Sequence, residues 1–117
     1  MKHVIHVDNS DFFRKIMKSY LSEKGLEYEG FERGEDAVNA VADGQASFLI
    51  TGLELPDMSG DELLKRLITL PQKTPIIVVT SNDVSEKQNH YKSLGVKAII
   101  MKSDDWKTEL GKILKLN

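Results

Sequence analysis

The run Ile76-Ile77-Val78-Val79-Thr80 is the most β-branched stretch of the chain and predicts a strand buried within a sheet. Short apolar runs of this kind alternate with amphipathic stretches five times along the 117 residues. This alternation is typical of a parallel sheet with crossover helices. The other strands are expected at residues 4–7, 26–31, 48–51 and 98–101, the second of them an edge strand with one wet face.

The amphipathic stretches predict a helix after each strand. The first begins near Ser10, and the fourth, at residues 84–94, is poor in apolar residues and should be the least securely packed. Glycine at positions 25, 44 and 95 is expected to end the first, second and fourth helices. The positions expected to face the core include Leu63, Leu64, Leu67 and Ile68 in the third helix, and Trp106, Leu110, Ile113 and Leu114 in the last.

The composition excludes several classes of protein. The chain has no cysteine, so disulfides and cysteine-ligated metals are excluded. Its net charge of −2, with basic residues scattered among acidic ones, argues against nucleic-acid and membrane partners. The sequence shows no signal peptide and no apolar run of membrane length. We expect one cytoplasmic domain over residues 1–117. The sequence leaves open whether an effector domain follows Asn117.

Polar residues follow four of the predicted strands. In open parallel sheets, ligands bind beyond the carboxyl ends of the strands, near the point where the strand order reverses. There the first strand delivers Asp8 and Asn9, the third Gly52, the fourth Thr80 and the fifth Lys102. These residues are the candidate site.

Four segments carry a resemblance to a known family: Val7-Asp8-Asn9-Ser10, Leu55-Pro56-Asp57-Met58-Ser59-Gly60, Val78-Val79-Thr80-Ser81 and Ile100-Met101-Lys102. In this order and spacing they resemble a two-component response-regulator receiver domain of the CheY-like type. The resemblance implies an α/β, flavodoxin-like (βα)5 fold. Its doubly wound, five-stranded parallel sheet has the order 2-1-3-4-5, with helices on both faces.

The resemblance also implies roles at the site, and the sequence departs from several of them. Asp8 retains the first acidic position, whereas Asn9 replaces the second and Gly52 stands where the phosphoacceptor aspartate belongs. Thr80 and Lys102 retain the groups that contact the phosphoryl oxygens. Ser103 replaces the usual proline after the lysine, and Ile99 replaces an aromatic residue.

These departures predict a degenerate pseudo-receiver. Glycine has no side chain that can attack phosphorus, so no catalytic residue is expected. Magnesium prefers carboxylate ligands, so its binding should be weak or absent, with Asp8 a weak candidate ligand and no cofactor expected. Asp8 and Lys102 are expected to form an ion pair that closes an unused pocket, or alternatively to bind a small anion.

The predicted function is therefore signalling by protein–protein interaction, not enzymatic catalysis, with a sensor kinase, effector or other signalling protein as the partner. One alternative is a receiver phosphorylated on Asp57, Asp8 or Glu54. A flavodoxin-like ligand-binding domain is another, and Gly52 as an engineered change in a normal receiver is a third.

The family resemblance suggests a partner surface on the fourth helix and fifth strand, which would also support a homodimer together with the fifth helix. Its residues are Lys87, His90, Tyr91, Ile99 and Met101.

In the first strand, His6 is expected to be a hydrogen-bonded structural histidine. His3 should face the opposite side of its strand, so the two histidines cannot bind one metal.

Overall fold

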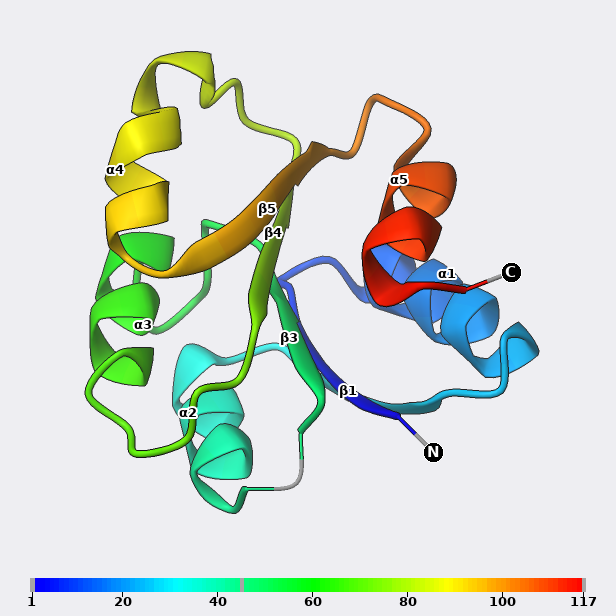
Figure 1. Ribbon diagram of the computed structural model, residues 1–117, viewed down its shortest axis with the longest axis horizontal. Coiled ribbons are helices and arrows are strands. Elements are labelled where there is room, and N and C mark those ends of the chain that lie inside the picture. Colours follow the sequence, from blue (N-terminus) through cyan, green and yellow to red (C-terminus); the bar gives the residue numbers. More distant parts are fainter. Residues whose placement is uncertain (1, 45, 117) are drawn as a thin grey trace.

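The computed structural model describes residues 2–44 and 46–116. β1 (His3–Val7), β2 (Glu27–Phe31), β3 (Phe48–Thr51), β4 (Ile76–Thr80) and β5 (Val96–Met101) form one sheet. All its neighbouring strands are parallel, and their order is β2-β1-β3-β4-β5 (Figure 1). The predicted fold and strand order are confirmed, with β2 at one edge.

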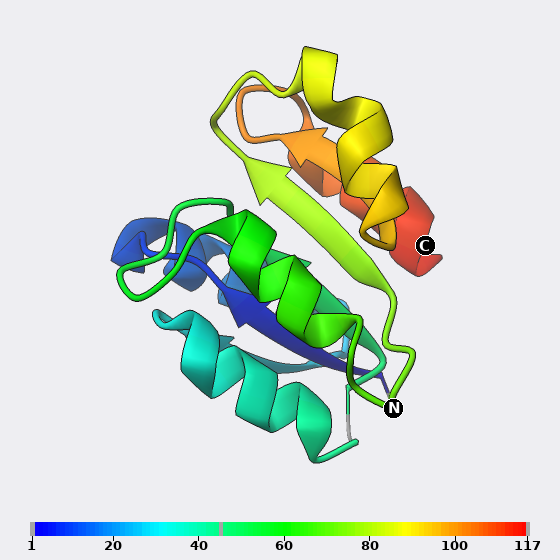
Figure 2. The same cartoon turned by 90° about the vertical axis from the view of Figure 1, so that its left-hand side faces the viewer.

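Helices cover both faces of the sheet. α1 (Asp11–Glu23) and α5 (Trp106–Leu114) lie on one face, and α2 (Gly34–Ala42), α3 (Gly60–Leu67) and α4 (Gln88–Ser93) lie on the other (Figures 1 and 2). Because side chains alternate along a strand, β1 supplies both cores: Val4 packs towards α1 and α5, while Ile5 and Val7 pack towards the other helices.

The α1–α5 layer is anchored by large apolar side chains at helical spacing. The buried residues of these two helices include Phe13, Met17, Leu21, Trp106, Leu110 and Leu114. Burial of each such side chain contributes roughly 1.5–3 kcal/mol. The prediction that Trp106 packs in the core is confirmed.

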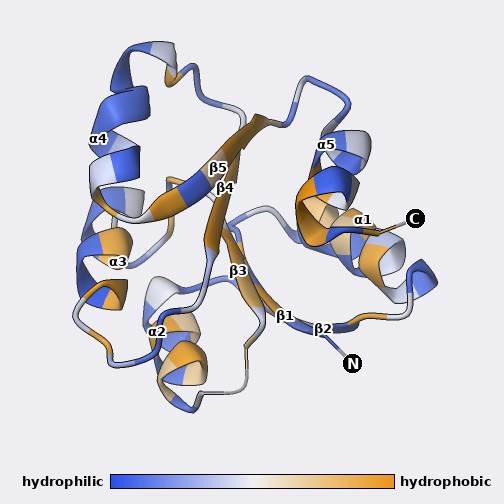
Figure 3. Ribbon diagram, viewed as in Figure 1, coloured by the Kyte–Doolittle hydropathy of each residue, from blue (hydrophilic) through white to orange (hydrophobic). Residues whose placement is uncertain are grey.

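The predicted fourth helix is shorter than expected. Residues 84–94 form a 3-10 turn at Ser85–Lys87 followed by the six-residue α4. No side chain caps the start of α4, and Tyr91 is its one buried residue. The hydropathy colouring shows the same contrast, because α4 is largely hydrophilic while β4 is hydrophobic (Figure 3). The weak packing follows from the scarcity of apolar residues in this segment.

Smaller differences concern the ends of elements. Ile68 was expected on the buried side of the third helix, but α3 ends at Leu67 and Ile68 is 46% exposed. That prediction is wrong because Ile68 is the C-cap of α3, and its side chain lies at the end of the helix, where it is only partly covered. Gly25, at φ 79°, directly follows Lys24, the C-cap of α1.

Among residues 2–44 and 46–116, no helix combines the length and apolarity that crossing a membrane requires.

Candidate functional site

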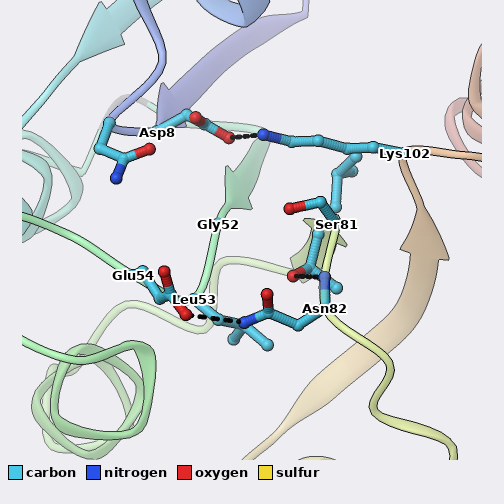
Figure 4. Close-up of a pocket in the computed structure, with 10 residues that line it drawn as sticks. Asp8, Gly52, Leu53, Glu54, Ser81, Asn82 and Lys102 are labelled. Carbon is cyan, nitrogen blue, oxygen red and sulfur yellow. Dashed lines mark hydrogen bonds and ion pairs between the residues drawn. The ribbon is translucent and has the colours of Figure 1, made fainter.

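Asp8 and Lys102 meet at the carboxyl edge of the sheet. Asp8 follows β1 and is 1% exposed, and Lys102 follows β5. The Lys102 ammonium lies 3.0 Å from Asp8 Oδ2, while the Ser10 backbone N–H donates to Oδ1 over 2.8 Å (Figure 4). Within the described chain, Oδ2 has no hydrogen-bond donor beyond this ion pair. Both oxygens of the buried carboxylate are therefore engaged, as the predicted ion pair requires.

Gly52 lies beneath this ion pair at the end of β3. Its N–H donates to the Val7 carbonyl over 2.9 Å, which continues the β1–β3 ladder. A Cβ atom at position 52 would lie 3.1 Å from Asp8 Oδ2 and 3.6 Å from Asp8 Cγ. The Asp8 carboxylate thus crowds position 52 and would have to shift slightly to admit a side chain there (Figure 4).

An aromatic ring supports the lysine from the α1 side. The Lys102 ammonium lies 4.2 Å from the centroid of the Phe13 ring, and Phe13 is 5% exposed. A cation at this distance from a ring face is attracted by the ring quadrupole. The sequence did not reveal this contact, because Phe13 is indistinguishable from the other apolar residues on the inner face of α1.

The opposite side of the pocket is formed by polar groups of β4 and of the loops after β3 and β4. The hydroxyl of the buried Thr80 accepts a hydrogen bond from the Asn82 backbone N–H over 3.0 Å. The Asn82 side chain donates to Glu54 Oε1 over 3.2 Å (Figure 4). Glu54, one of the alternative phosphoacceptors, is exposed and lies in the loop after β3. Asn82 was missed, since a polar residue in a loop carries no distinctive signal.

The pocket brought together by these residues is small. Its volume is about 40 Å³, and its lining includes all five predicted site residues: Asp8, Asn9, Gly52, Thr80 and Lys102. Because each water needs roughly 10–15 Å³ of such space, the pocket holds a few waters or a small ion. It is too small for a flavin, which weighs against the flavodoxin-like alternative.

The other candidate carboxylate, Asp57, has a structural partner. It accepts hydrogen bonds from the backbone N–H groups of Gly34 (2.8 Å) and Glu35 (3.0 Å) at the start of α2. Desolvation acts to raise the pKa of Asp57, but the hydrogen bonds from Glu35 and Gly34 outweigh it and the pKa is lowered. The carboxylate thus acts as a cap for α2. In residues 2–44 and 46–116, no three His, Asp or Glu side chains converge as metal ligands.

His6 lies deep beside the site, on the face of β1 that meets α1. Its Nδ1 lies 2.7 Å from the Tyr28 hydroxyl, which itself donates to the Arg14 carbonyl, so Nδ1 is the donor to Tyr28. Burial, together with the charges of Lys102 and Arg14, lowers the pKa of His6 to about 3. The predicted role as a hydrogen-bonded structural histidine is confirmed.

The predicted partner surface is only partly available. Lys87 and His90 are exposed and Ile99 and Met101 are half-buried, but Tyr91 is 4% exposed. The inclusion of Tyr91 is therefore wrong, because the short α4 uses this ring to pack against the core. The neighbouring His90 Nε2 lies 2.8 Å from Asp61 Oδ2 in α3, and this hydrogen bond lowers the pKa of Asp61.

Comparison with known proteins identifies the family. The model of the response regulator receiver domain matches residues 4–113, and the chain therefore belongs to this family. Receiver domains act in two-component signalling, where they interact with sensor kinases and effector proteins.

Three curated relatives illustrate the range of proteins that contain such a domain. The chain is 29% identical over 86 residues to the uncharacterized transcriptional regulatory protein YkoG of Bacillus subtilis, covering 69% of this chain and 36% of YkoG. It is 35% identical over 98 residues to a protein-glutamate methylesterase/protein-glutamine glutaminase of Halalkalibacterium halodurans, covering 82% of this chain and 28% of that protein. It is 23% identical over 99 residues to the sensor histidine kinase RcsC of Escherichia coli, covering 85% of this chain and 10% of RcsC. The chain thus spans about a third or less of each relative.

Solved structures share the fold along nearly the whole chain. Response regulator TrrA from Thermotoga maritima, in complex with Mg2+-BeF, is 26% identical with a TM-score of 0.84, covering 100% of both chains. A CheY-like receiver domain protein from Methanospirillum hungatei is 25% identical with a TM-score of 0.88, covering 98% of this chain and 92% of that one.

Proposed function

We propose that this receiver domain signals by binding a protein partner and is not phosphorylated at the end of β3. The observation that carries the proposal is the Asp8 carboxylate lying over Gly52 while it pairs with Lys102. The position lacks a nucleophile, and the carboxylate that crowds it already has its cation. A phosphoryl group placed there would have to compete with Asp8 for Lys102.

The same geometry supports the absence of a magnesium cofactor. Of the acidic groups at the pocket, Asp8 is engaged through both oxygens and Glu54 accepts from Asn82. Asn9 offers only a neutral amide. This donor set does not fit magnesium, which relies on carboxylate oxygens and gives up its own water reluctantly.

The proposal extends to the partners of the domain. We infer a sensor kinase, an effector or another signalling protein as the partner, because the relatives with such receivers include a sensor histidine kinase and a transcriptional regulatory protein. The exposed and half-buried residues on α4 and β5 would serve a homodimer or an effector. We propose that residues 1–117 act as one non-catalytic, cytoplasmic unit that contacts neither nucleic acid nor membrane itself.

A phosphodonor assay tests the proposal. The chain is incubated with acetyl phosphate and magnesium, its intact mass is measured, and a receiver with an intact phosphoacceptor serves as the positive control. No added phosphoryl mass is expected. Stoichiometric labelling would overturn the proposal, and peptide mapping would then show whether Asp8, Glu54 or Asp57 is the acceptor.

A further inference from the structure

A groove runs along the outer side of the α1–α5 layer, away from the candidate site and from α4. Its volume is about 310 Å³, and the residues that form it include Tyr20, Lys24, Lys107, Gly111, Lys112 and Leu116. Gly111 shapes its floor, because a Cβ atom there would lie 2.8 Å from the Tyr20 hydroxyl. That hydroxyl donates to the Lys107 carbonyl over 2.8 Å and fixes the ring between the two helices.

The three lysines of the groove form no ion pair with a carboxylate in the described part of the chain. None of the ion pairs found within residues 2–44 and 46–116 includes Lys24, Lys107 or Lys112. Two of the ammonium groups lie over the Tyr20 ring instead, at 5.9 Å for Lys24 and 6.0 Å for Lys107. The nearby Asp105 is the N-cap of α5, where it accepts from the Thr108 backbone and hydroxyl. These hydrogen bonds and the charges of Lys107 and Lys112 lower the pKa of Asp105, which forms no ion pair with either lysine among the described residues.

The groove lies within a wider positive surface. α1 and α5, together with their cap residues, contain seven Lys or Arg against four Asp or Glu, although the whole chain has a net charge of −2. By contrast, α2, α3 and α4 together contain three Lys or Arg and four Asp or Glu. Positive charge is therefore more concentrated on the α1–α5 layer than on the other layer.

A series of ring contacts connects this groove with the candidate site. The Lys102 ammonium lies over Phe13, the rings of Phe13 and Trp106 are 5.1 Å apart, and those of Trp106 and Tyr20 are 5.6 Å apart. Phe13 and Trp106 are both buried, so the contacts pass through the core. Trp106 is the one tryptophan of the chain and packs directly against the floor of the groove.

We propose that this groove binds an acidic peptide segment of a protein partner. The inference rests on the proposed function and deepens it by naming the surface and the chemistry of the partner. A concave floor formed by Tyr20, with Leu116 beside it, suits side chains of a peptide, and the unpaired ammonium groups suit its carboxylates. An acidic peptide can contact the groove alone, whereas DNA or an anionic membrane would extend beyond it and be opposed by the net negative charge of the chain.

Binding of a fluorescein-labelled oligoglutamate peptide tests the proposal, with Trp106 emission as a second readout. The variant K24Q/K107Q/K112Q removes the three charges of the groove, and K65Q/K73Q/K92Q removes three exposed charges from the other layer and its connections. We expect saturable binding that changes Trp106 emission, is weakened roughly tenfold in the groove variant and is unchanged in the control. Circular dichroism verifies that both variants keep the fold.

Two results would overturn the proposal. The first is no saturable binding of oligoglutamate, or equal weakening in both variants. The second is binding of only single-stranded DNA or phosphatidylserine vesicles, which would assign the surface to another class of partner. The phosphodonor assay is independent of this test, so labelling without loss of peptide binding would overturn the proposed function alone.

Discussion

The α1–α5 layer and α4 of this receiver differ in how firmly they are attached to the sheet. α1 and α5 each bury three large apolar side chains, and their rings are in contact, whereas α4 buries Tyr91 alone. The candidate site reflects the same difference. Its Asp8–Lys102 side is buried against the α1–α5 layer, whereas its other side is held by the exposed hydrogen bond between Glu54 and Asn82. The residues that close the pocket are thus held by the part of the molecule that is least free to rearrange.

Truncation of core residues should show the largest contrast between the α1–α5 layer and α4. Leu110→Ala removes a fully buried side chain from α5 and should lower the free energy of unfolding by about 3 kcal/mol. Leu94→Ala, at the C-cap of α4 where the leucine is 9% exposed, should cost less, about 2 kcal/mol. Urea denaturation measures both. A loss at Leu94 equal to or above that at Leu110 would contradict the contrast.

The next largest difference in stability is expected between variants on the two sides of the pocket. Asp8→Asn leaves the largely buried Lys102 ammonium without its carboxylate and should cost about 2.5 kcal/mol of unfolding free energy. The matched variant Glu54→Gln alters the exposed side and should change stability by no more than about 0.5 kcal/mol. If both variants unfold at the same urea concentration, the buried ion pair does not hold the site closed.

Acid should lower the free energy of unfolding through protonation of His6, which lies on the α1 side of the sheet. The pKa of His6 is lowered from 6.5 to about 3 in the folded chain, so the unfolded chain binds the proton more readily. Stability from neutral His6 is therefore complete above pH 6.5 and is lost as the pH falls towards 3. The loss should reach about 2 kcal/mol by pH 5. In His6→Phe the stability profile from urea titrations should be flatter over this range, and an unchanged slope would exclude His6 as its source.

Much of this contrast was visible in the sequence. The strands, their order and the inward stripe of α5 follow from periodicity and resemblance, because burial forces apolar residues into regular spacing. The pairing of Asp8 with Lys102 also followed, since both residues end strands of one parallel sheet. The stacking of Lys102 on Phe13 did not, because the rotation of α1 about its axis depends on packing across the layer. Tyr91 was misplaced for a similar reason: the length of α4 depends on contacts that its sparse apolar pattern does not encode.

The smallest effect is expected at the link between α3 and α4. The ion pair between His90 and Asp61 involves side chains that are 43% and 40% exposed, so His90→Gln should cost roughly 0.5 kcal/mol or less. A double-mutant cycle with Asp61→Asn isolates the pair. A coupling energy of several times this size would show that α4 is held more firmly than its single buried residue suggests.

The central claim, that the Asp8–Lys102 pair closes a site without a phosphoacceptor, is tested most directly by NMR. The chain is titrated with magnesium and the phosphoryl mimic beryllofluoride, and the backbone amides of Asp8, Gly52, Thr80 and Lys102 are followed, with Gly52→Asp titrated in parallel. We predict no saturable shifts in the wild-type chain. Saturable shifts of these amides in the wild type would contradict the account.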